Sequence, residues 1–296
     1  MNLPTVKQLR YFAALVETHH FGRAAEACFV SQSAFSNAIR ELELLLEVQL
    51  VDRTNRSVTV TAIGQQIAVQ ARLCLRDVES LVELAQGQRQ PLSGDLRLGV
   101  IPTIAPFLLP RVLPRLRREF PDLQLYLHED QTQRIYARLM DGDLDAILLA
   151  LPWKMRGVET TSLFRDRFCL AYRDGTDRVD PENYRFNRLD ADSILLLEDG
   201  HCLRDHALAA CKIRNTQKVQ LFAASSVLTL IEMIDADLGI TFLPQMASGS
   251  ALLKNTRVKL KPLSESSYRT IGLAWRKGSG RREEFRMLGE VLKNNR

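Results

Sequence analysis

Residues from about position 92 onward alternate between short apolar runs and amphipathic runs, and this alternation constrains the fold most strongly. The apolar runs have the length of β-strands, and the runs between them space apolar residues three or four apart, as helices do. Strands are predicted at 96–101, 123–128, 144–149, 168–172, 193–197, 219–223, 239–243 and 270–275. Helices are predicted at 106–120, 132–141, 203–212, 227–235 and 281–293. This pattern predicts an α/β fold with a largely parallel sheet.

Three of the predicted strands end in polar segments, which are Ile101–Thr103, His128–Thr132 and Leu197–Cys202. In open α/β sheets, ligands bind beyond the carboxyl ends of the strands. The three segments are therefore expected to converge on one crevice between two subdomains.

The first 65 residues have a different pattern, with helices predicted at 6–18, at 23–28 and from Ser31 to about position 45. On the third helix, Phe35, Ile39 and Leu42 share one face and are expected to lie inward. The opposite face carries mostly uncharged hydrogen-bonding residues, which suit the reading of base edges in a DNA major groove: Gln32, Ser33, Ser36, Asn37 and Arg40. Two short helices at this spacing predict a helix-turn-helix. The alternative is a small helical domain whose polar stripe is only solvated.

Residues 49–64 read as two short strands around a polar turn, which makes the predicted domain a winged helix-turn-helix. Arg53 and Arg56 lie at this wing, where they are expected to contact DNA phosphates. Net charge does not locate a DNA surface, because the nine basic residues of positions 1–90 are matched by nine acidic ones, although the whole chain carries +5.

A long helix is predicted at 62–88, followed by a polar hinge with Gly and Pro at 86–94. Apolar and small residues repeat along this helix at alternating spacings of four and three, which predicts a seam packed against a partner helix: Ile67, Ala71, Cys74, Val78, Leu81 and Ala85. The alternative is a helix that lies on its own domain.

Cys202 follows the turn at Asp199-Gly200 and stands at the predicted start of a helix, where the helix dipole favours a thiolate. His201, Arg204 and His206 add positive partners, whereas Glu198, Asp199 and Asp205 oppose the thiolate, so the direction of the shift in thiol pKa stays open. Cys211 lies nine residues later, roughly 13 Å along an intact helix. A disulfide needs Cα atoms within about 7 Å, so joining these cysteines would unwind the helix. Spacing alone favours the alternative of two inert buried cysteines.

Several segments resemble the LysR-type transcriptional regulator family. The resemblance rests on Phe21-Gly-Arg-Ala-Ala, Val30-Ser-Gln-Ser, Ile39-Arg-Glu-Leu-Glu, Asp52-Arg and Thr61-Ala-Ile-Gly. The segment Leu197-Glu-Asp-Gly-His-Cys-Leu-Arg-Asp, with Cys211, resembles the sensing segment of the peroxide-sensing members of that family. Two departures lie in the DNA-binding part: Ser33-Ala-Phe replaces the usual Pro-Ser/Thr-Leu, and Ile63 stands where Ala is frequent.

The resemblance implies an organisation of three parts. These are a winged helix-turn-helix at 1–61, a linker and dimerisation helix with its hinge at 62–91, and a regulatory domain at 92–296. The regulatory domain would have two lobes like a periplasmic binding protein, with lobe I at about 92–164 plus 270–296 and lobe II at about 165–269. The implied partners are double-stranded operator DNA, RNA polymerase and further copies of the chain in a homodimer or homotetramer.

The resemblance also implies a reaction with hydrogen peroxide. Cys202 would be oxidised to a sulfenic acid and captured by Cys211 as a disulfide. Thr103, Thr132, His201 and Arg269 would bind peroxide or support the thiolate. Each has an ordinary alternative: Thr103 and Thr132 as helix caps, His201 as a surface histidine, and Arg269 as an ion-pair partner. Cys28 and Cys169 are interpreted as core residues.

Two other functions are weighed against a peroxide-switched regulator. One is a regulator of the same family that binds a small organic ligand between the lobes, with incidental cysteines. The other is a thiol peroxidase, for which a DNA-binding domain would have no use. The sequence has no common cofactor-enzyme motif, so no enzyme activity, cofactor or metal is expected. An odd number of cysteines without a C-x-x-C pattern, no signal-like N-terminus and no apolar run near the roughly 18 residues of a membrane span predict a cytoplasmic protein.

Overall fold

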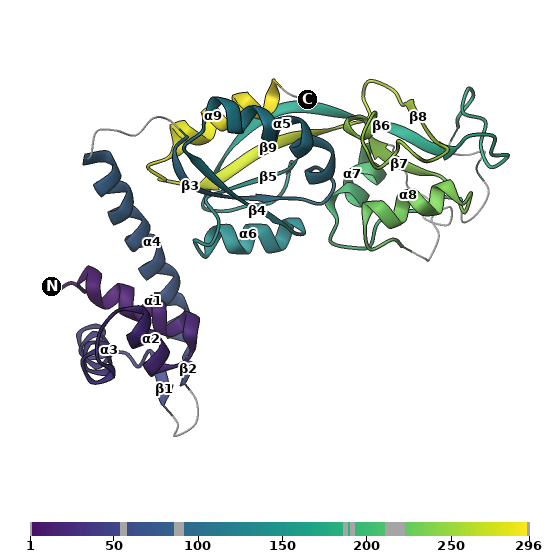
Figure 1. Ribbon diagram of the computed structural model, residues 1–296. Helices are drawn as coiled ribbons and strands as arrows, with labels where there is room; N and C mark the ends of the chain where they lie inside the picture. Colours follow the sequence, from purple (N-terminus) through teal and green to yellow (C-terminus); the bar gives the residue numbers. More distant parts are fainter. Residues whose placement is uncertain are drawn as a thin grey trace. The chain divides into compact units, whose positions relative to one another are not determined.

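The computed structural model describes residues 2–53, 58–85, 92–185, 189, 193–210 and 223–294. The chain forms two compact units (Figure 1): one contains residues 1–89 and 140–143, and the other contains residues 90–139 and 144–296. We call them the N-terminal unit and the regulatory unit. Within the described ranges, none of the helices combines the length and the apolar character that crossing a bilayer requires.

The N-terminal unit consists of three short helices, a hairpin and a long helix. The helices are α1 (Val6–Thr18), α2 (Phe21–Ala27), α3 (Gln32–Leu46) and α4 (Ala62–Ala85), and β1 (Val51–Arg53) pairs antiparallel with β2 (Val58–Val60). Ser31 caps α3, because its side chain accepts a hydrogen bond from the backbone N–H of Ala34 at 3.3 Å. These elements confirm the predicted winged helix-turn-helix.

The core of this unit contains the residues that helical periodicity placed inward. Phe35, Ile39 and Leu42 are fully buried, and the Tyr11 ring stacks on the Phe35 ring with centroids 5.0 Å apart. Cys28 is buried in the same core, as predicted. The first half of α4 also packs here, since Ala68 belongs to this core and Ile67 packs against it.

The regulatory unit contains a curled seven-stranded sheet with helices on both sides (Figure 1). Its strands are β3 (Gly94–Val100), β4 (Leu123–Glu129), β5 (Ala146–Leu151), β6 (Val158–Arg173), β7 (Thr241–Pro244), β8 (Val258–Pro262) and β9 (Tyr268–Arg276). Its helices are α5 (Ala105–Glu119), α6 (Thr132–Met140), α7 (Cys202–Ala210), α8 (Val227–Asp235), the 3₁₀ helix η3 (Gln245–Ala247) and α9 (Arg282–Lys293).

Two lobes are built on the crossing strands β6 and β9. The strand order is β4-β3-β5-β9-β6-β7, and β8 also pairs with β6. The first part of β6 pairs with β9, and its last residues, from Phe168 on, pair with β7 and β8. Figure 1 shows α5, α6 and α9 around one end of this arrangement and α7 and α8 around the other. The predicted two-lobed α/β architecture is confirmed, and the lobe boundaries stay a prediction.

The predicted largely parallel sheet is correct only for the strands β3, β4 and β5. β3 pairs parallel with β4 and β5, whereas β9 is antiparallel to β5 and β6, and β7 and β8 are antiparallel to β6. The cause is topological, because β6 leaves the first lobe and β9 returns to it, so the two must run in opposite directions.

Individual strand predictions also need correction. β6 starts ten residues before the predicted 168, because Thr160, Ser162 and Arg165 interrupt its apolar run on the more exposed side. The predicted strand 193–197 makes only isolated bridges from Ile194 to Ile240 and from Leu197 to Ala224. β8 was not predicted, and of the predicted strand 219–223 only the last residue lies in the described ranges.

We predict that Gly64→Ala destabilises the N-terminal unit by roughly 1–3 kcal/mol, as overpacking does. A Cβ at this position would overlap the carbonyl oxygen of Leu50, and backbone at that point cannot move away without disturbing the fold. Hydrogen exchange of peptides from α1 and α3 measures the loss. The matched control is Gly280→Ala, whose new Cβ meets no atom within 4 Å. Unchanged exchange protection in Gly64→Ala would contradict this packing.

Candidate functional site

The three polar strand ends meet in one narrow recess of the regulatory unit, as predicted. The recess is lined by residues that follow β3, begin α6 and begin α7: Ile101, Pro102, Thr103, Gln131, Thr132, Gly200, His201 and Cys202. Arg269, on β9, reaches this site by bonding Thr103. The recess has no room for a water-sized molecule in this state. The structure thus brings together five of the six predicted sensor residues, which are Thr103, Thr132, His201, Cys202 and Arg269; the sixth is Cys211.

Cys202 is the first residue of α7 and is only 7% exposed. Burial raises the pKa of its thiol, and this effect exceeds the opposing influence of the Arg269 charge and of hydrogen bonds from the Thr132 hydroxyl and the Ala150 backbone. The structure therefore shows that the pKa of Cys202 is raised, a direction that the sequence left open. Desolvation decides this direction, so the thiol holds its proton more strongly than an ordinary cysteine.

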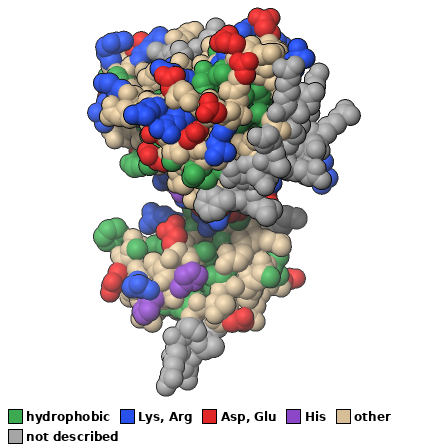
Figure 2. All heavy atoms as spheres, turned by 90° about the vertical axis from the view of Figure 1, so that its right-hand side faces the viewer, with side chains coloured by type: hydrophobic (Ala, Val, Ile, Leu, Met, Phe, Trp, Pro, Cys, Tyr) green, Lys and Arg blue, Asp and Glu red, His purple; other side chains and the backbone are tan. Residues whose placement is uncertain are grey.

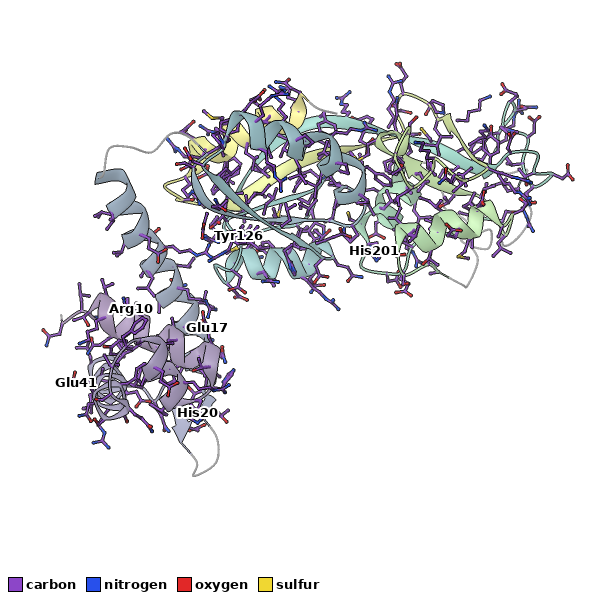
Figure 3. All side chains as sticks on the ribbon, viewed as in Figure 1. Arg10, Glu17, His20, Glu41, Tyr126 and His201 are labelled. Atoms are coloured by element: carbon purple, nitrogen blue, oxygen red, sulfur yellow. The ribbon has the colours of Figure 1, made fainter. Side chains whose placement is uncertain are left out.

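Two histidines near Cys202 do not supply the positive charge expected from the sequence. His201 is buried, so the surface alternative is wrong. Figure 3 labels its position in the regulatory unit. Burial lowers the pKa of His201 although Glu198 opposes the shift, and burial together with Arg269 lowers the pKa of His206. Arg204 is charged but pairs with Asp199 at 2.9 Å.

Arg269 supplies the positive charge of the site. Its side chain is fully buried, and its Nε donates to Asp166 Oδ2 at 3.0 Å. Nη1 donates to the hydroxyl of Thr103 at 2.9 Å, and Nη2 donates to the Thr103 carbonyl at 2.8 Å. Asp166 also accepts from the Met246 backbone at 3.1 Å. The ion-pair alternative for Arg269 is correct, and the same guanidinium also acts on the thiol.

The sequence interpretation missed Asp166, which is the partner of Arg269. Burial raises the pKa of Asp166, and Arg269 opposes that rise. A signal for Asp166 was present in the sequence, because this carboxylate lies between two apolar residues of the same strand, Phe164 and Phe168, and both are buried. A charge at such a position is rarely tolerated without a partner.

The two threonines do not cap helices, so that alternative is wrong for both. The N-cap of α5 is Ile104, which makes no side-chain cap bond, and the Thr103 hydroxyl accepts from Arg269 instead. The Thr132 hydroxyl is buried and has no conventional hydrogen-bond partner among the described residues, although it lies close enough to the thiol to lower its pKa.

The end of β5 holds α7 at two points. The backbone of Ala150 bonds the thiol of Cys202, and the backbone of Pro152 bonds His206 one turn further along the helix. The Nδ1 atom of His206 is buried and has no partner within the described ranges. α7 is therefore attached to the first lobe through the first and fifth of its residues.

Cys211 lies outside the described residues, so the prediction of its pairing with Cys202 stays a prediction. The cysteines described are all free: Cys28, Cys74, Cys169 and Cys202. Cys169 is buried in the core of β6, as predicted, and burial with the nearby Asp166 charge raises its pKa to about 11. It is consequently an unreactive thiol at neutral pH.

The predicted DNA-reading stripe lies along α3. Gln32, Ser33, Asn37 and Arg40 are exposed, and Ser36 is half-buried. Of the two wing arginines, Arg53 lies on β1 without a described side chain, and Arg56 lies outside the described residues. On the face drawn in Figure 2, uncharged side chains and backbone dominate the N-terminal unit, so charge alone does not mark an interface there.

The predicted seam on α4 divides into two parts. Ile67 and Ala71 are covered by the N-terminal unit itself, which matches the alternative of a helix lying on its own domain. Further along, Cys74, Val78 and Leu81 are exposed, and so is Val82. The side chain of Ala85 is outside the described set.

Two family models match the chain. Residues 6–65 match a model described as "Bacterial regulatory helix-turn-helix protein, lysR family", and residues 89–296 match one described as "LysR substrate binding domain". Together they cover both units.

Relatives match over almost the whole chain. The chain is 40% identical over 292 residues to the HTH-type transcriptional regulator EstR of Acinetobacter baylyi, covering 98% of this chain and 97% of EstR. It is 39% identical over 288 residues to the DNA-binding transcriptional dual regulator OxyR of Escherichia coli, covering 97% and 94%. The structure of a full-length OxyR variant from Pseudomonas aeruginosa matches with a TM-score of 0.83 at 32% identity, covering 99% and 96%.

We predict that Asp166→Asn lowers the free energy of unfolding of the regulatory unit by roughly 3–5 kcal/mol, because it leaves the Arg269 charge buried without a counter-ion. Urea unfolding followed by tryptophan fluorescence reports this unit, since both tryptophans, Trp153 and Trp275, lie in it. The matched control is Glu265→Gln, which removes the exposed pair between Arg167 and Glu265 and should change stability by less than about 1 kcal/mol. Equal effects of the two variants would disprove the role given to the buried pair.

We also predict that the stability of the regulatory unit falls as pH drops from 7 to 5, partly through His206. Its pKa is lowered in the folded state, so below about pH 6.5 the unfolded chain binds a proton that the folded chain does not. His206→Gln should reduce this slope by up to about 1.4 kcal/mol per pH unit. Urea unfolding at each pH measures it, and identical slopes in the two proteins would refute the assignment.

Proposed function

The chain belongs to the LysR family of bacterial transcriptional regulators, and from this premise we propose that it is a regulator switched by oxidation of Cys202 with hydrogen peroxide. The family assignment rests on both matched domains and on relatives that align along nearly the full chain. The oxidative switch rests on the surroundings of Cys202 in the regulatory unit.

The N-terminal unit is a DNA-binding domain of the LysR type. We propose that α3 enters the major groove and that its exposed residues Gln32, Ser33, Asn37 and Arg40, with Ser36, contact base edges. Arg53 and Arg56 would contact phosphates from the wing. The proposed target is double-stranded operator DNA in the cytoplasm, with RNA polymerase as the further partner.

The observation that carries the switch is a buried thiol that lies beside a buried guanidinium and a buried hydroxyl. Arg269 and the Thr132 hydroxyl both lower the pKa of Cys202 against the effect of burial. A cation and hydrogen-bond donors beside the sulfur also stabilise the negative charge that develops on the leaving peroxide oxygen in the transition state. Thr103, Thr132 and His201 line the place where peroxide would approach the sulfur, and the narrow recess would first have to widen.

The proposed reaction has two steps. The sulfur of deprotonated Cys202 attacks one peroxide oxygen, the O–O bond breaks, and the leaving hydroxide takes up a proton to become water. The thiol of Cys211 then attacks the sulfenic sulfur, a second water leaves, and a disulfide forms. Peroxide is the oxidant, and the two thiols supply the electrons.

Disulfide formation would remodel α7. This helix runs from Cys202 to Ala210, immediately before Cys211, and an intact helix would separate the two Cα atoms by roughly 13 Å, against the 7 Å or so that a disulfide allows. The attachments of Cys202 to Ala150 and of His206 to Pro152 would then be lost. That rearrangement is the proposed signal from the sensor to the DNA-binding units.

The exposed apolar residues Val78, Leu81 and Val82 on α4 support assembly into a homodimer or homotetramer. An isolated helix that presents such a row to solvent gains stability by packing along a second helix. A symmetric dimer would bind two half-sites of an operator, and a change in the regulatory units would alter their spacing.

A second candidate function is a regulator of the same family that binds a small organic ligand, with incidental cysteines. Two observations favour it: burial raises rather than lowers the pKa of Cys202, and one relative with 40% identity is EstR rather than OxyR. The two candidates differ in one measurement, which is the loss of titratable thiols on addition of low peroxide.

We predict that the reduced protein loses two thiols on treatment with about one equivalent of peroxide and that Cys202→Ser loses none. Cys211→Ser should stop at a sulfenic acid on Cys202, which mass spectrometry after trapping detects. Footprinting on operator DNA should change on oxidation in the wild type but not in Cys202→Ser, whose DNA binding persists.

Cys74→Ser is the matched control, because Cys74 is an exposed free thiol outside the site and its removal should leave the response unchanged. If wild-type protein keeps all its thiols under peroxide, the organic-ligand candidate replaces the switch. Retained oxidation-dependent footprinting in Cys202→Ser would also eliminate the switch.

A further inference from the structure

The rim of the recess around Cys202 is formed by three of the residues that line it. The other lining residues are buried. Those that reach solvent are Pro102 and Gln131, which are half-buried, and Gly200, which is exposed. The proline side chain is a closed ring and the glycine has none, so Gln131 is the rim residue whose side chain can rotate. Rotation of that side chain is therefore the smallest movement that opens or closes the recess.

The carboxamide of Gln131 lies against Gly200. A Cβ at position 200 would be 2.8 Å from Oε1 and 3.2 Å from Nε2 of Gln131, so the carboxamide fills the space that a side chain at position 200 would take. Gly200 also has a φ of +94°, a conformation that residues with a Cβ rarely adopt. The missing side chain at position 200 is thus what allows Gln131 to close over the rim.

The main chain of Gln131 is fixed, whereas its side chain can turn. The backbone N–H donates to Asp130 Oδ1 at 2.8 Å, and the carbonyl accepts from the backbone N–H groups of Arg134 at 3.0 Å and Ile135 at 3.1 Å. Within the described part of the chain, the carboxamide has no hydrogen-bond partner, so rotating it breaks no such bond. Side chains at the surface change rotamer in picoseconds to nanoseconds. Gln131 can therefore serve as a cover that opens far faster than a thiol reacts.

We propose that this cover selects which peroxides reach Cys202, an inference that rests on the proposed oxidation of that thiol. The closed recess has no room for a molecule of the size of water, so an oxidant enters only when Gln131 turns aside. Hydrogen peroxide is little larger than water and needs only that rotation. An alkyl hydroperoxide also has to bring its alkyl group past the rim, where the rotated side chain still takes up space. Gln131 thus favours hydrogen peroxide over alkyl hydroperoxides.

Both classes of oxidant would react with the same sulfur in the same step. The deprotonated sulfur of Cys202 attacks one peroxide oxygen and becomes a sulfenic acid, while the O–O bond breaks. The other oxygen takes up a proton and leaves as water or as an alcohol. The fraction of thiolate is common to both reactions, so the ratio of their rates does not depend on the pKa of Cys202. That ratio reports access to the sulfur.

Quench-flow oxidation of the reduced full-length protein by hydrogen peroxide and by tert-butyl hydroperoxide measures the ratio, and mass spectrometry of the Cys202 peptide identifies the thiol that reacts. We expect Gln131→Ala to lower the preference for hydrogen peroxide at least tenfold. Gln131→Met, whose side chain is of similar length, should keep the wild-type preference. Gln133→Ala is the matched control, because Gln133 is an exposed glutamine on the same helix, α6.

A second pair of reagents tests access to Cys202 without peroxide. Methyl and benzyl methanethiosulfonate each transfer an alkylthio group to a thiolate, which forms a mixed disulfide and releases methanesulfinate. We expect Gln131→Ala to lower the preference for the methyl reagent at least tenfold as well. An unchanged preference in Gln131→Ala, or an equal loss in Gln131→Met or Gln133→Ala, overturns the inference. Resistance of Cys202 to both peroxides overturns the proposed oxidation instead, and the thiosulfonate pair then decides the role of Gln131 by itself.

Discussion

The ion pair between Asp166 and Arg269 is the interaction on which the regulatory unit depends. It joins the two strands that connect the lobes, at directly paired positions, and both side chains are almost completely buried. Burying two charges costs several kcal/mol per ion, and that cost is offset only when every donor and acceptor is used. The hydroxyl and carbonyl of Thr103 and the Met246 backbone complete the set, so one pair fixes strands, loop and 3₁₀ helix together.

The same pair governs the chemistry at Cys202. A thiol that is 7% exposed resists ionisation, and the buried guanidinium is the largest influence that opposes this resistance. Asp166 competes for that guanidinium, which limits how much of its charge reaches the sulfur. Burial also raises the pKa of Cys169, to about 11, and there the Asp166 charge adds to the rise. The ion pair thus acts in opposite senses on two buried thiols, because its cation opposes the rise at Cys202 and its anion adds to the rise at Cys169.

Local features of the sequence predicted local structure well. Helix 227–235 has the predicted bounds, Ser31 caps α3, and the three polar strand ends meet in one recess.

Long-range features were harder to predict. The antiparallel direction of β9 depends on where the chain returns from the second lobe to the first. A pattern within a short stretch of sequence does not show that position. The direction of the Cys202 pKa shift depends on how deeply the fold buries the thiol, and two groups that oppose the shift, Ala150 and Thr132, are 52 and 70 residues away along the chain. Asp166 was visible as a charge in an apolar strand, but its partner lies 103 residues later.

The two attachments of α7 to the end of β5 lie one helical turn apart, at Cys202 and His206. Both depend on the geometry of that single turn, because residues four apart share one face only while the helix is intact. Unwinding of this turn would therefore separate α7 from β5 at both points.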